Sequence, residues 1–204
     1  MIGQEKMNKE LKKYENIIKE LMGSKRFKHS VNVAEMSVSL AKKFGVDQDK
    51  AYIAGILHDC QKEADKDIML KEAKESGYYI DPVELECFKL WHGPAAAYYV
   101  KEKLKIEDKD ILNAIRFHTV GRADMSALEK IVFLADMVSA ERSYPDVEKY
   151  REAVMKDLNN GMFLTLRWSI LKTAGLGNTI PLCTLEGYNF YAPYKNEDDF
   201  VFQK

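Results

Sequence analysis

An imidazole and a carboxylate stand side by side at the end of an apolar run in this sequence. The run is Ala51–Leu57, and the pair that follows it is His58-Asp59. Burying such a pair without a partner would cost several kcal/mol, so the fold must supply one. A divalent metal ion is the partner that uses imidazole and carboxylate together. A single His-Asp dipeptide also arises by chance, so the rest of the chain decides the interpretation.

The spacing of apolar residues predicts helices along most of the chain. Between about Lys28 and Phe44, for example, His29 and Val33 fall on one helical face, and Gly45 follows the predicted end. Similar segments, opened by Asp or Ser at N-cap positions, recur as far as Gly175, and we find no convincing alternation of period two. The predicted fold class is all-α, a single-domain helical bundle.

Glycine and proline predict several of the helix boundaries. Asp81 followed by Pro82 indicates an N-cap, and that helix is expected to run to about Trp91. Gly93-Pro94 is expected to begin the next helix, and Gly161 to separate the last two.

The predicted helices divide the chain into three parts. Residues 1–24 are expected to form an N-terminal helix, and residues 25–175 the helical core. Residues 176–204 show no helical or strand period, and we expect them to be an irregular segment that packs on the core.

Charge and composition exclude several classes of protein. Lysine and arginine number 31 and aspartate and glutamate 32, with the two signs mixed along the chain. This balance gives no general reason to bind nucleic acid or a membrane surface. No leader-like segment and no apolar stretch of about 20 residues is present, so a cytoplasmic location is expected. The cysteines match no metal spacing and are expected to be reduced: Cys60, Cys87 and Cys183.

All four histidines lie on or beside the predicted core-facing side of a helix: His29, His58, His92 and His118. Asp136 falls inside an equally apolar run, Val132–Val138. A lone buried histidine is usually hydrogen-bonded within the core, and a lone buried aspartate usually caps a helix or meets an arginine. Together, imidazoles and carboxylates on facing helices are typical of metal sites in helical bundles.

The order His29, His58-Asp59, Asp136 resembles the H…HD…D signature of the HD superfamily of metal-dependent phosphohydrolases. Longer motifs narrow the resemblance to its YqeK-type branch: Arg26–Ser30, His58–Lys62, His92–Pro94, His118–Arg122 and Ala135–Met137, with Arg142 following. Members of that branch are symmetrical bis(5'-nucleosyl)-tetraphosphatases, which cut diadenosine tetraphosphate into two ADP.

The resemblance implies an HD-type helical core and a set of metal ligands. His29, His58, Asp59 and Asp136 would hold one ion. His92 and His118 would bind a second ion or a phosphate in a more open site. Asp59 could be a ligand of both sites. The resemblance favours iron, whereas the ligand types also suit manganese or zinc, with one or two ions bound.

Hydrolysis of a phosphoanhydride needs a nucleophile at neutral pH and positive charge near the phosphoryl oxygens. The metal centre would supply the nucleophile, with Asp59, Lys62, His92 and His118 as the catalytic candidates. The substrate-binding candidates are Arg26, His92, His118, Thr119, Arg122, Arg142, Tyr188 and Asn189, although each cation taken singly could be a surface charge and the aromatic cluster could simply close the core. The family has Pro-x-Thr before Tyr-Asn in that last segment, whereas this chain has one residue more between Pro181 and Thr184.

Two classes of function remain open on the sequence. The first is an enzyme, either the symmetrical tetraphosphatase or a broader HD nucleotidase acting on nucleoside mono- or triphosphates. The second is a nucleotide-sensing metal module without turnover. The presence of all six candidate ligands favours the enzyme. The expected partner is a nucleotide substrate, and a homodimer is left open.

Overall fold

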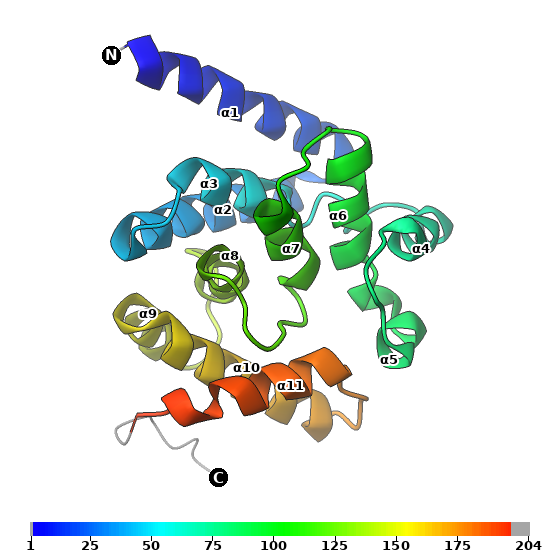
Figure 1. The fold of residues 1–204 in the computed structure, drawn as a ribbon, viewed down its shortest axis with the longest axis vertical. Coiled ribbons are helices and arrows are strands. Elements are labelled where there is room, and N and C mark those ends of the chain that lie inside the picture. Colours follow the sequence, from blue (N-terminus) through cyan, green and yellow to red (C-terminus); the bar gives the residue numbers. More distant parts are fainter. Residues whose placement is uncertain (1, 197–204) are drawn as a thin grey trace.

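The computed structural model describes residues 2–196, with side chains from residue 11 onward, and confirms the all-α prediction. These residues form eleven α-helices and two short 3-10 helices, and no strand occurs among them (Figure 1). The elements are α1 (Ile2–Leu21), α2 (Ser24–Phe44), α3 (Gln48–Leu57), α4 (Lys66–Glu75), α5 (Pro82–Glu86), η1 (Phe88–Leu90), α6 (His92–Glu102), α7 (Lys109–Phe117), α8 (Ala127–Val138), α9 (Val147–Lys156), α10 (Leu158–Gly175), α11 (Leu182–Tyr191) and η2 (Ala192–Tyr194).

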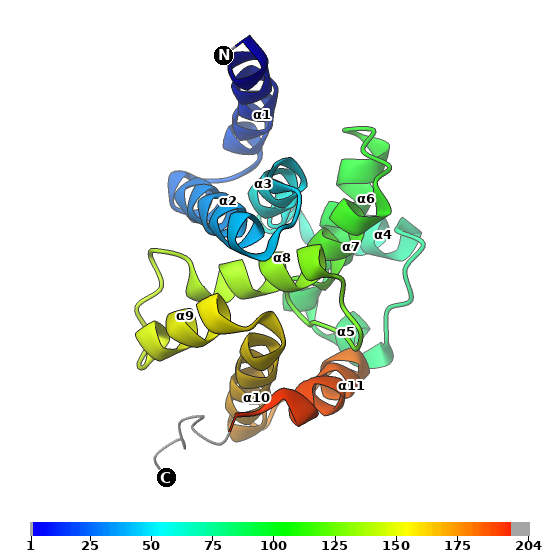
Figure 2. The ribbon, with the colours of Figure 1, turned by 60° about the vertical axis from the view of Figure 1, so that its left-hand side comes forward.

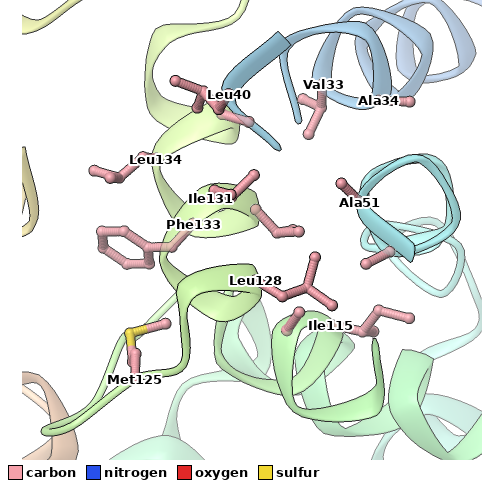
Figure 3. Packing of buried hydrophobic residues seen from close by; sticks show 14 of the residues in the cluster. Val33, Ala34, Leu40, Ala51, Ile115, Met125, Leu128, Ile131, Phe133 and Leu134 are labelled. Carbon is pink, nitrogen blue, oxygen red and sulfur yellow. The ribbon is translucent and has the colours of Figure 1, made fainter. Parts of the chain in front are cut away.

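Helix α8 lies near the middle of the fold and packs against α2, α3, α7, α9 and α10 (Figure 2). Leu128 and Ile131 point toward α2, α3 and α7, whereas Phe133 and Leu134 point to the opposite side (Figure 3). All four of these side chains are buried. Burying a side chain of this size contributes about 1.5–3 kcal/mol, so the apolar run of α8 holds α2, α3 and α7 together, the helices that carry or precede His29, His58 and His118.

Side-chain caps begin the helices where the sequence predicts them. Asp47 accepts hydrogen bonds from the backbone at the start of α3, and Asp108 does the same at the start of α7. Asp81 and Ser126 each form a capping box, at the starts of α5 and α8. Such caps contribute on the order of 1 kcal/mol each and fix where a helix begins.

The predicted end of the helix that begins at Asp81-Pro82 is wrong, whereas the next helix begins within one residue of the predicted Gly93-Pro94 start. Helix α5 ends at Glu86 rather than near Trp91, and the Trp91 indole N–H donates to the carbonyls of Glu84 and Leu85 at the helix end. Helix α6 begins at His92, ahead of the Gly-Pro pair. Pro94 is tolerated because the first N–H groups of a helix have no partner within the helix.

Gly161 does not separate α9 from α10, since it lies inside α10. The boundary is instead Asp157, whose side chain accepts hydrogen bonds from the backbone of Asn159 and Asn160. A Cβ at Gly161 would lie 3.0 Å from Val154 Cγ2, so this glycine lets α9 and α10 pack closely.

The expectation of an irregular segment after residue 175 is also wrong, because α11 and η2 lie within it. This segment contacts the core: the backbone N–H of Met125 donates to Tyr191 Oη, and Thr184 Oγ1 donates to the carbonyl of Val120. The buried face of α11 consists of Thr184, Gly187 and Tyr191, so it carries no apolar stripe that a sequence pattern could detect. Residues 197–204 of the predicted segment lie outside the described residues.

Two glycines let helices approach closely beside the histidines. A Cβ at Gly55 of α3 would lie 2.8 Å from Ala34 Cα of α2. A Cβ at Gly93 of α6 would lie 2.7 Å from the carbonyl oxygen of Arg116 in α7. Both contacts are with backbone, which cannot rotate away, so no larger residue fits without moving a helix. Within the described part of the chain, none of the helices has both the length and the apolar character needed to cross a bilayer.

We predict that Gly93→Ala moves α6 away from α7 and lowers the free energy of unfolding by about 1–3 kcal/mol, as overpacking does. Denaturant unfolding monitored by circular dichroism measures this change. The matched control is Gly175→Ala at the end of α10, where an added Cβ meets nothing within 4 Å. Equal unfolding midpoints for the two variants would contradict the close-packing argument.

Candidate metal centre

The structure brings all six candidate ligands into one buried cluster, which we call the His/Asp centre: His29 of α2, His58-Asp59 just past α3, His92 of α6, His118 just past α7 and Asp136 of α8. Their ligand atoms form three overlapping groups, within each of which all atoms lie at most 4.8 Å apart. The prediction of a buried His/Asp metal-binding cluster is confirmed.

Three of the histidines are oriented in the same way. In His58, His92 and His118, Nδ1 donates to the carbonyl oxygen three residues earlier, at 2.6, 2.8 and 2.7 Å respectively. These carbonyls lie in the last turn of α3, in η1 and in the last turn of α7, where backbone oxygens lack a partner within the helix. A carbonyl can only accept, so Nδ1 carries the proton and Nε2 presents a lone pair to the centre.

His29 is oriented by a carboxylate instead of a carbonyl. Its Nδ1 donates to Glu141, which also accepts hydrogen bonds from Asn32 Nδ2 at 2.7 Å and Ser139 Oγ at 2.8 Å. Nε2 of His29 therefore faces inward with a lone pair, as in the other three histidines. Carboxylate–histidine pairs of this kind orient metal ligands in many proteins.

Asp59 lies between two pairs of histidines. Its Oδ2 is 3.7 Å from His29 Nε2 and 3.5 Å from His58 Nε2. Its Oδ1 is 3.2 Å from His92 Nε2 and 3.5 Å from His118 Nε2. Each oxygen of one carboxylate thus faces a different pair of imidazoles, which is the geometry of a bridging ligand.

The charge states of Asp59 and His92 suit a bound cation. Burial by itself would raise the pKa of Asp59, but His58, His118 and His92 hold the pKa of this carboxyl well below its usual range. Burial lowers the pKa of His92 to about 4, so this imidazole is neutral at pH 7. Ionised carboxylate and neutral imidazole are the forms that bind metal ions.

Two nitrogen atoms of the centre have no hydrogen-bond partner, and two others lie close together. His29 Nε2 and His58 Nε2 are buried without a hydrogen-bond partner among the described residues. Nε2 of His92 and Nε2 of His118 lie 3.0 Å apart, so two lone pairs face each other. A bound cation would satisfy the unpaired nitrogens and remove this repulsion, and the donor set therefore fits a divalent transition metal.

His92 and His118 are not in a more open site, contrary to expectation. Both are as buried as His58, because Gly93 brings α6 against α7.

Thr119 Oγ1 lies 3.0 Å from His92 Nε2 and 2.9 Å from His118 Nε2. Lys62 Nζ lies 3.0 Å from the His92 ring, and burial lowers the pKa of this lysine. Lys62 and Thr119 thus lie at this end of the centre.

A cavity of about 590 Å³ borders the His29 end of the centre, and we call it the Trp168 pocket. Arg26 and Arg142 line it, and each contacts a carboxylate of the centre. Arg26 Nη1 is 2.8 Å from Asp59 Oδ2, and Arg142 donates through Nη2 to the Asp136 carboxylate. Both side chains are partly exposed, so their guanidinium groups can reach a bound anion.

A second cavity of about 470 Å³ borders the His92 end, and we call it the Thr119 pocket. Thr119, which contacts His92 and His118, lines it, and so does Lys89, whose carbonyl orients His92. Pro181 and Thr184 at the start of α11 also line it. Both cavities are in the range of small-molecule sites, roughly 300–1,000 Å³.

Three of the substrate-binding candidates lie elsewhere. Arg122 is held in a two-point contact with the fully buried Glu129, at 2.7 and 2.8 Å, and lines neither pocket. Tyr188 stacks on Phe163 with ring centroids 5.8 Å apart, so it closes the core. Asn189 is exposed on α11.

Glu141 and the aromatic wall of the Trp168 pocket, formed by Tyr144 and Trp168, were not predicted from the sequence. Glu141 follows Ser139 just past α8, where no periodicity marks it. The sequence carried one signal for this pocket: Trp168 and Lys172 lie four residues apart on α10. Residues at this spacing share a helical face, so the two side chains could be expected to lie together.

An all-α core with four imidazoles and two carboxylates around a common point defines the class of HD-type metal-binding proteins. The HD domain model matches residues 26–141, more than half of the chain. This protein therefore belongs to the HD domain family.

Relatives narrow this assignment and confirm the resemblance seen in the motifs. The chain is 40% identical to a symmetrical bis(5'-nucleosyl)-tetraphosphatase of Halalkalibacterium halodurans, over 85% of this chain and 92% of the relative. It is 36% identical to the symmetrical bis(5'-nucleosyl)-tetraphosphatase of Bacillus subtilis, over 74% and 80% respectively. A crystal structure from Clostridium acetobutylicum, described as a predicted HD superfamily hydrolase involved in NAD metabolism, superposes with a TM-score of 0.85 at 33% identity and covers 90% of this chain and 97% of that one.

We predict that Asp59→Asn removes most of the bound metal, because this substitution weakens the one carboxylate that faces both pairs of histidines. Elemental analysis of protein purified without chelator measures the metal content. Asp108→Asn is the matched control, since Asp108 caps α7 at the surface and asparagine caps equally well. Wild-type metal content in Asp59→Asn would rule out Asp59 as a ligand.

Proposed function

We propose that this protein is a metal-dependent phosphohydrolase that cleaves bis(5'-nucleosyl)-tetraphosphates symmetrically, giving two ADP from diadenosine tetraphosphate. The observation that carries the proposal is the complete His/Asp centre in a chain 40% identical to a symmetrical tetraphosphatase over 85% of its length. In this reaction a water oxygen bonds to one inner phosphorus, and the central bridging oxygen leaves with the other ADP.

We propose that the centre would hold two ions and that Asp59 would be a ligand of both. His29, His58 and Asp136 would complete one site, and His92 and His118 the other. The ligand set suits iron, with manganese and zinc as alternatives that metal analysis distinguishes. A bound divalent ion supplies a water nucleophile with its pKa lowered toward neutrality, and positive charge for the phosphoryl oxygens.

The residues around the centre have separate proposed roles. Arg26 and Arg142 bind phosphoryl oxygens from the side of the Trp168 pocket, where guanidinium groups offer two-point contacts. Lys62 and Thr119 hold a phosphate at the other end and position it against His92 and His118.

No side-chain nucleophile competes with water in this proposal. Burial raises the pKa of the Cys60 thiol, so at neutral pH this thiol is protonated and unreactive. Ser30 Oγ is buried and donates to the sulfur of Met22, 3.7 Å away. Neither group faces a phosphate as an activated nucleophile.

We expect the metal-loaded enzyme to convert diadenosine tetraphosphate to ADP alone, because attack at either inner phosphorus yields two identical halves. Anion-exchange chromatography of the products measures this outcome, and chelation of the metal should abolish the reaction. Equal amounts of AMP and ATP would show an asymmetrical hydrolase and contradict the proposal.

We predict that Arg142→Ala weakens transition-state binding by about 1.5–3 kcal/mol while leaving the metal content unchanged, because a charge-assisted contact to phosphate is lost. The matched variant is Arg122→Ala, which should lower stability by about 2–3 kcal/mol by leaving Glu129 buried and unpaired, yet keep kcat/KM near wild type. Steady-state kinetics and denaturant unfolding of both variants are the measurements. Unchanged kinetics in Arg142→Ala would show that this arginine does not contact the substrate.

A further inference from the structure

The histidines of the centre lie in a row with a different cavity at each end. Ring centroids are 5.3 Å apart for His29 and His58, 4.8 Å for His58 and His118, and 4.9 Å for His118 and His92. The Trp168 pocket is lined by His29 at one end of the row. The Thr119 pocket lies beside His92 at the other end, where Thr119 touches both imidazoles.

Helix α10 contributes side chains to both cavities from neighbouring faces. Trp168 and Lys172 line the Trp168 pocket, and Ser169 and Thr173 line the Thr119 pocket. Each pair is spaced four residues apart and shares a face, and the two faces differ by about 100° around the helix. The C-terminal half of α10 therefore forms a wall between the pockets, both of which border the same centre.

The Trp168 pocket combines an aromatic surface with positive charge. The Trp168 ring is half-buried, with Tyr144 against it at a centroid distance of 5.3 Å and Lys172 Nζ 4.6 Å from its centroid. Arg26 and Arg142 line the same pocket on the side of the centre. An indole with cations beside it is suited to stack a nucleobase while the cations hold its phosphates.

The Thr119 pocket offers polar groups at an apolar surface. Ser169, Thr173, Asn178 and Thr179 provide hydroxyl and amide groups, and the Phe88 ring lies at the rim. This combination suits a ribose and a base bound through hydrogen bonds. The two cavities are similar in volume, at about 590 and 470 Å³.

We propose that the Trp168 pocket and the Thr119 pocket are the two nucleoside subsites of one dinucleoside polyphosphate, with the Trp168 indole as the base-stacking surface of the first. The tetraphosphate chain would run along the row of histidines. Its central bridge would then lie over the His/Asp centre, so two pockets flanking one centre direct cleavage to the middle of the substrate. This inference rests on the proposed function for its substrate, but its binding test is independent of turnover.

The first test uses tryptophan fluorescence, since the chain has only two tryptophans. In metal-loaded Trp91→Phe protein, ADP should quench the fluorescence of Trp168 in a saturable titration. In Trp168→Phe protein, which retains Trp91, ADP should cause little quenching. A Trp168 signal that does not respond to ADP would overturn the assignment of the first pocket.

The second test counts ADP by equilibrium dialysis against metal-loaded protein. Wild type should bind about two ADP per chain at saturation. Trp168→Ala should lose one of the two and raise the KM for diadenosine tetraphosphate by about tenfold, as expected for a lost base-stacking contact. Trp168→Phe keeps an aromatic ring and should remain close to wild type.

The Thr119 pocket is tested by filling it. Thr173→Phe should also reduce ADP binding to one per chain, whereas Ala174→Phe, at an exposed position on the same helix that lines neither pocket, should still bind two. Metal content and circular dichroism should equal wild type in each variant.

The outcomes separate this inference from the proposed function. Cleavage to ADP by a protein that binds a single ADP, or that binds two regardless of Trp168→Ala and Thr173→Phe, would overturn the two subsites and leave the activity standing. Two ADP sites sensitive to these substitutions, in a protein that does not cleave the dinucleotide, would support the subsites and overturn the activity.

Discussion

The orientation of the imidazoles is the interaction on which the site depends. Three histidines donate Nδ1–H to a carbonyl three residues earlier, and His29 donates to Glu141. Each of these hydrogen bonds uses an oxygen that is already in place, either a backbone carbonyl near a helix end or the Glu141 carboxylate, which Asn32 and Ser139 hold. The result is four Nε2 lone pairs directed at Asp59 and Asp136. Without these hydrogen bonds the imidazole rings could rotate. Their Nε2 atoms would then no longer point at a common position where a metal ion can bind.

Close packing of the helices makes that orientation effective. Gly55 places α3 against α2, and Gly93 places α6 against α7, so the histidines come from separate parts of the chain to within contact of one carboxylate. Helix α8 provides the surface on which α2, α3 and α7 rest, and it carries Asp136 on the same rigid element. A site built on helices in this way keeps its geometry because moving a ligand means moving the core.

The position of the centre between two cavities connects the fold to a symmetrical reaction. In the proposed binding mode, the imidazoles with a pocket at each end would accommodate a substrate whose two halves are the same. Helix α10, packed on α8, supplies side chains to both pockets, so the helices that build the core also shape the substrate site. Cations on the Trp168 side and Lys62 on the other side complement the charge of a polyphosphate.

The sequence by itself determined the all-α class, most helix starts and the identity of the six candidate ligands. These follow from local rules: helical periodicity, N-cap chemistry, and the free-energy cost of burying imidazole or carboxylate without a partner. Such rules could not predict helix ends that depend on side-chain contacts. One example is the end of α5, where the Trp91 indole binds the last carbonyls. Nor could they predict α11, whose buried face of Thr184, Gly187 and Tyr191 forms no apolar stripe.

Only the tertiary structure decided which charged and aromatic residues face the site. Arg26 and Arg142 reach the centre while Arg122 is bound to Glu129, although all three are arginines near a motif residue. Trp168 lines a pocket and Tyr188 packs on Phe163, although both are aromatic residues on C-terminal helices. The reason is physical: the direction of a long side chain depends on helix packing and on the buried partner that competes for it, and neither is encoded within a few residues of the chain.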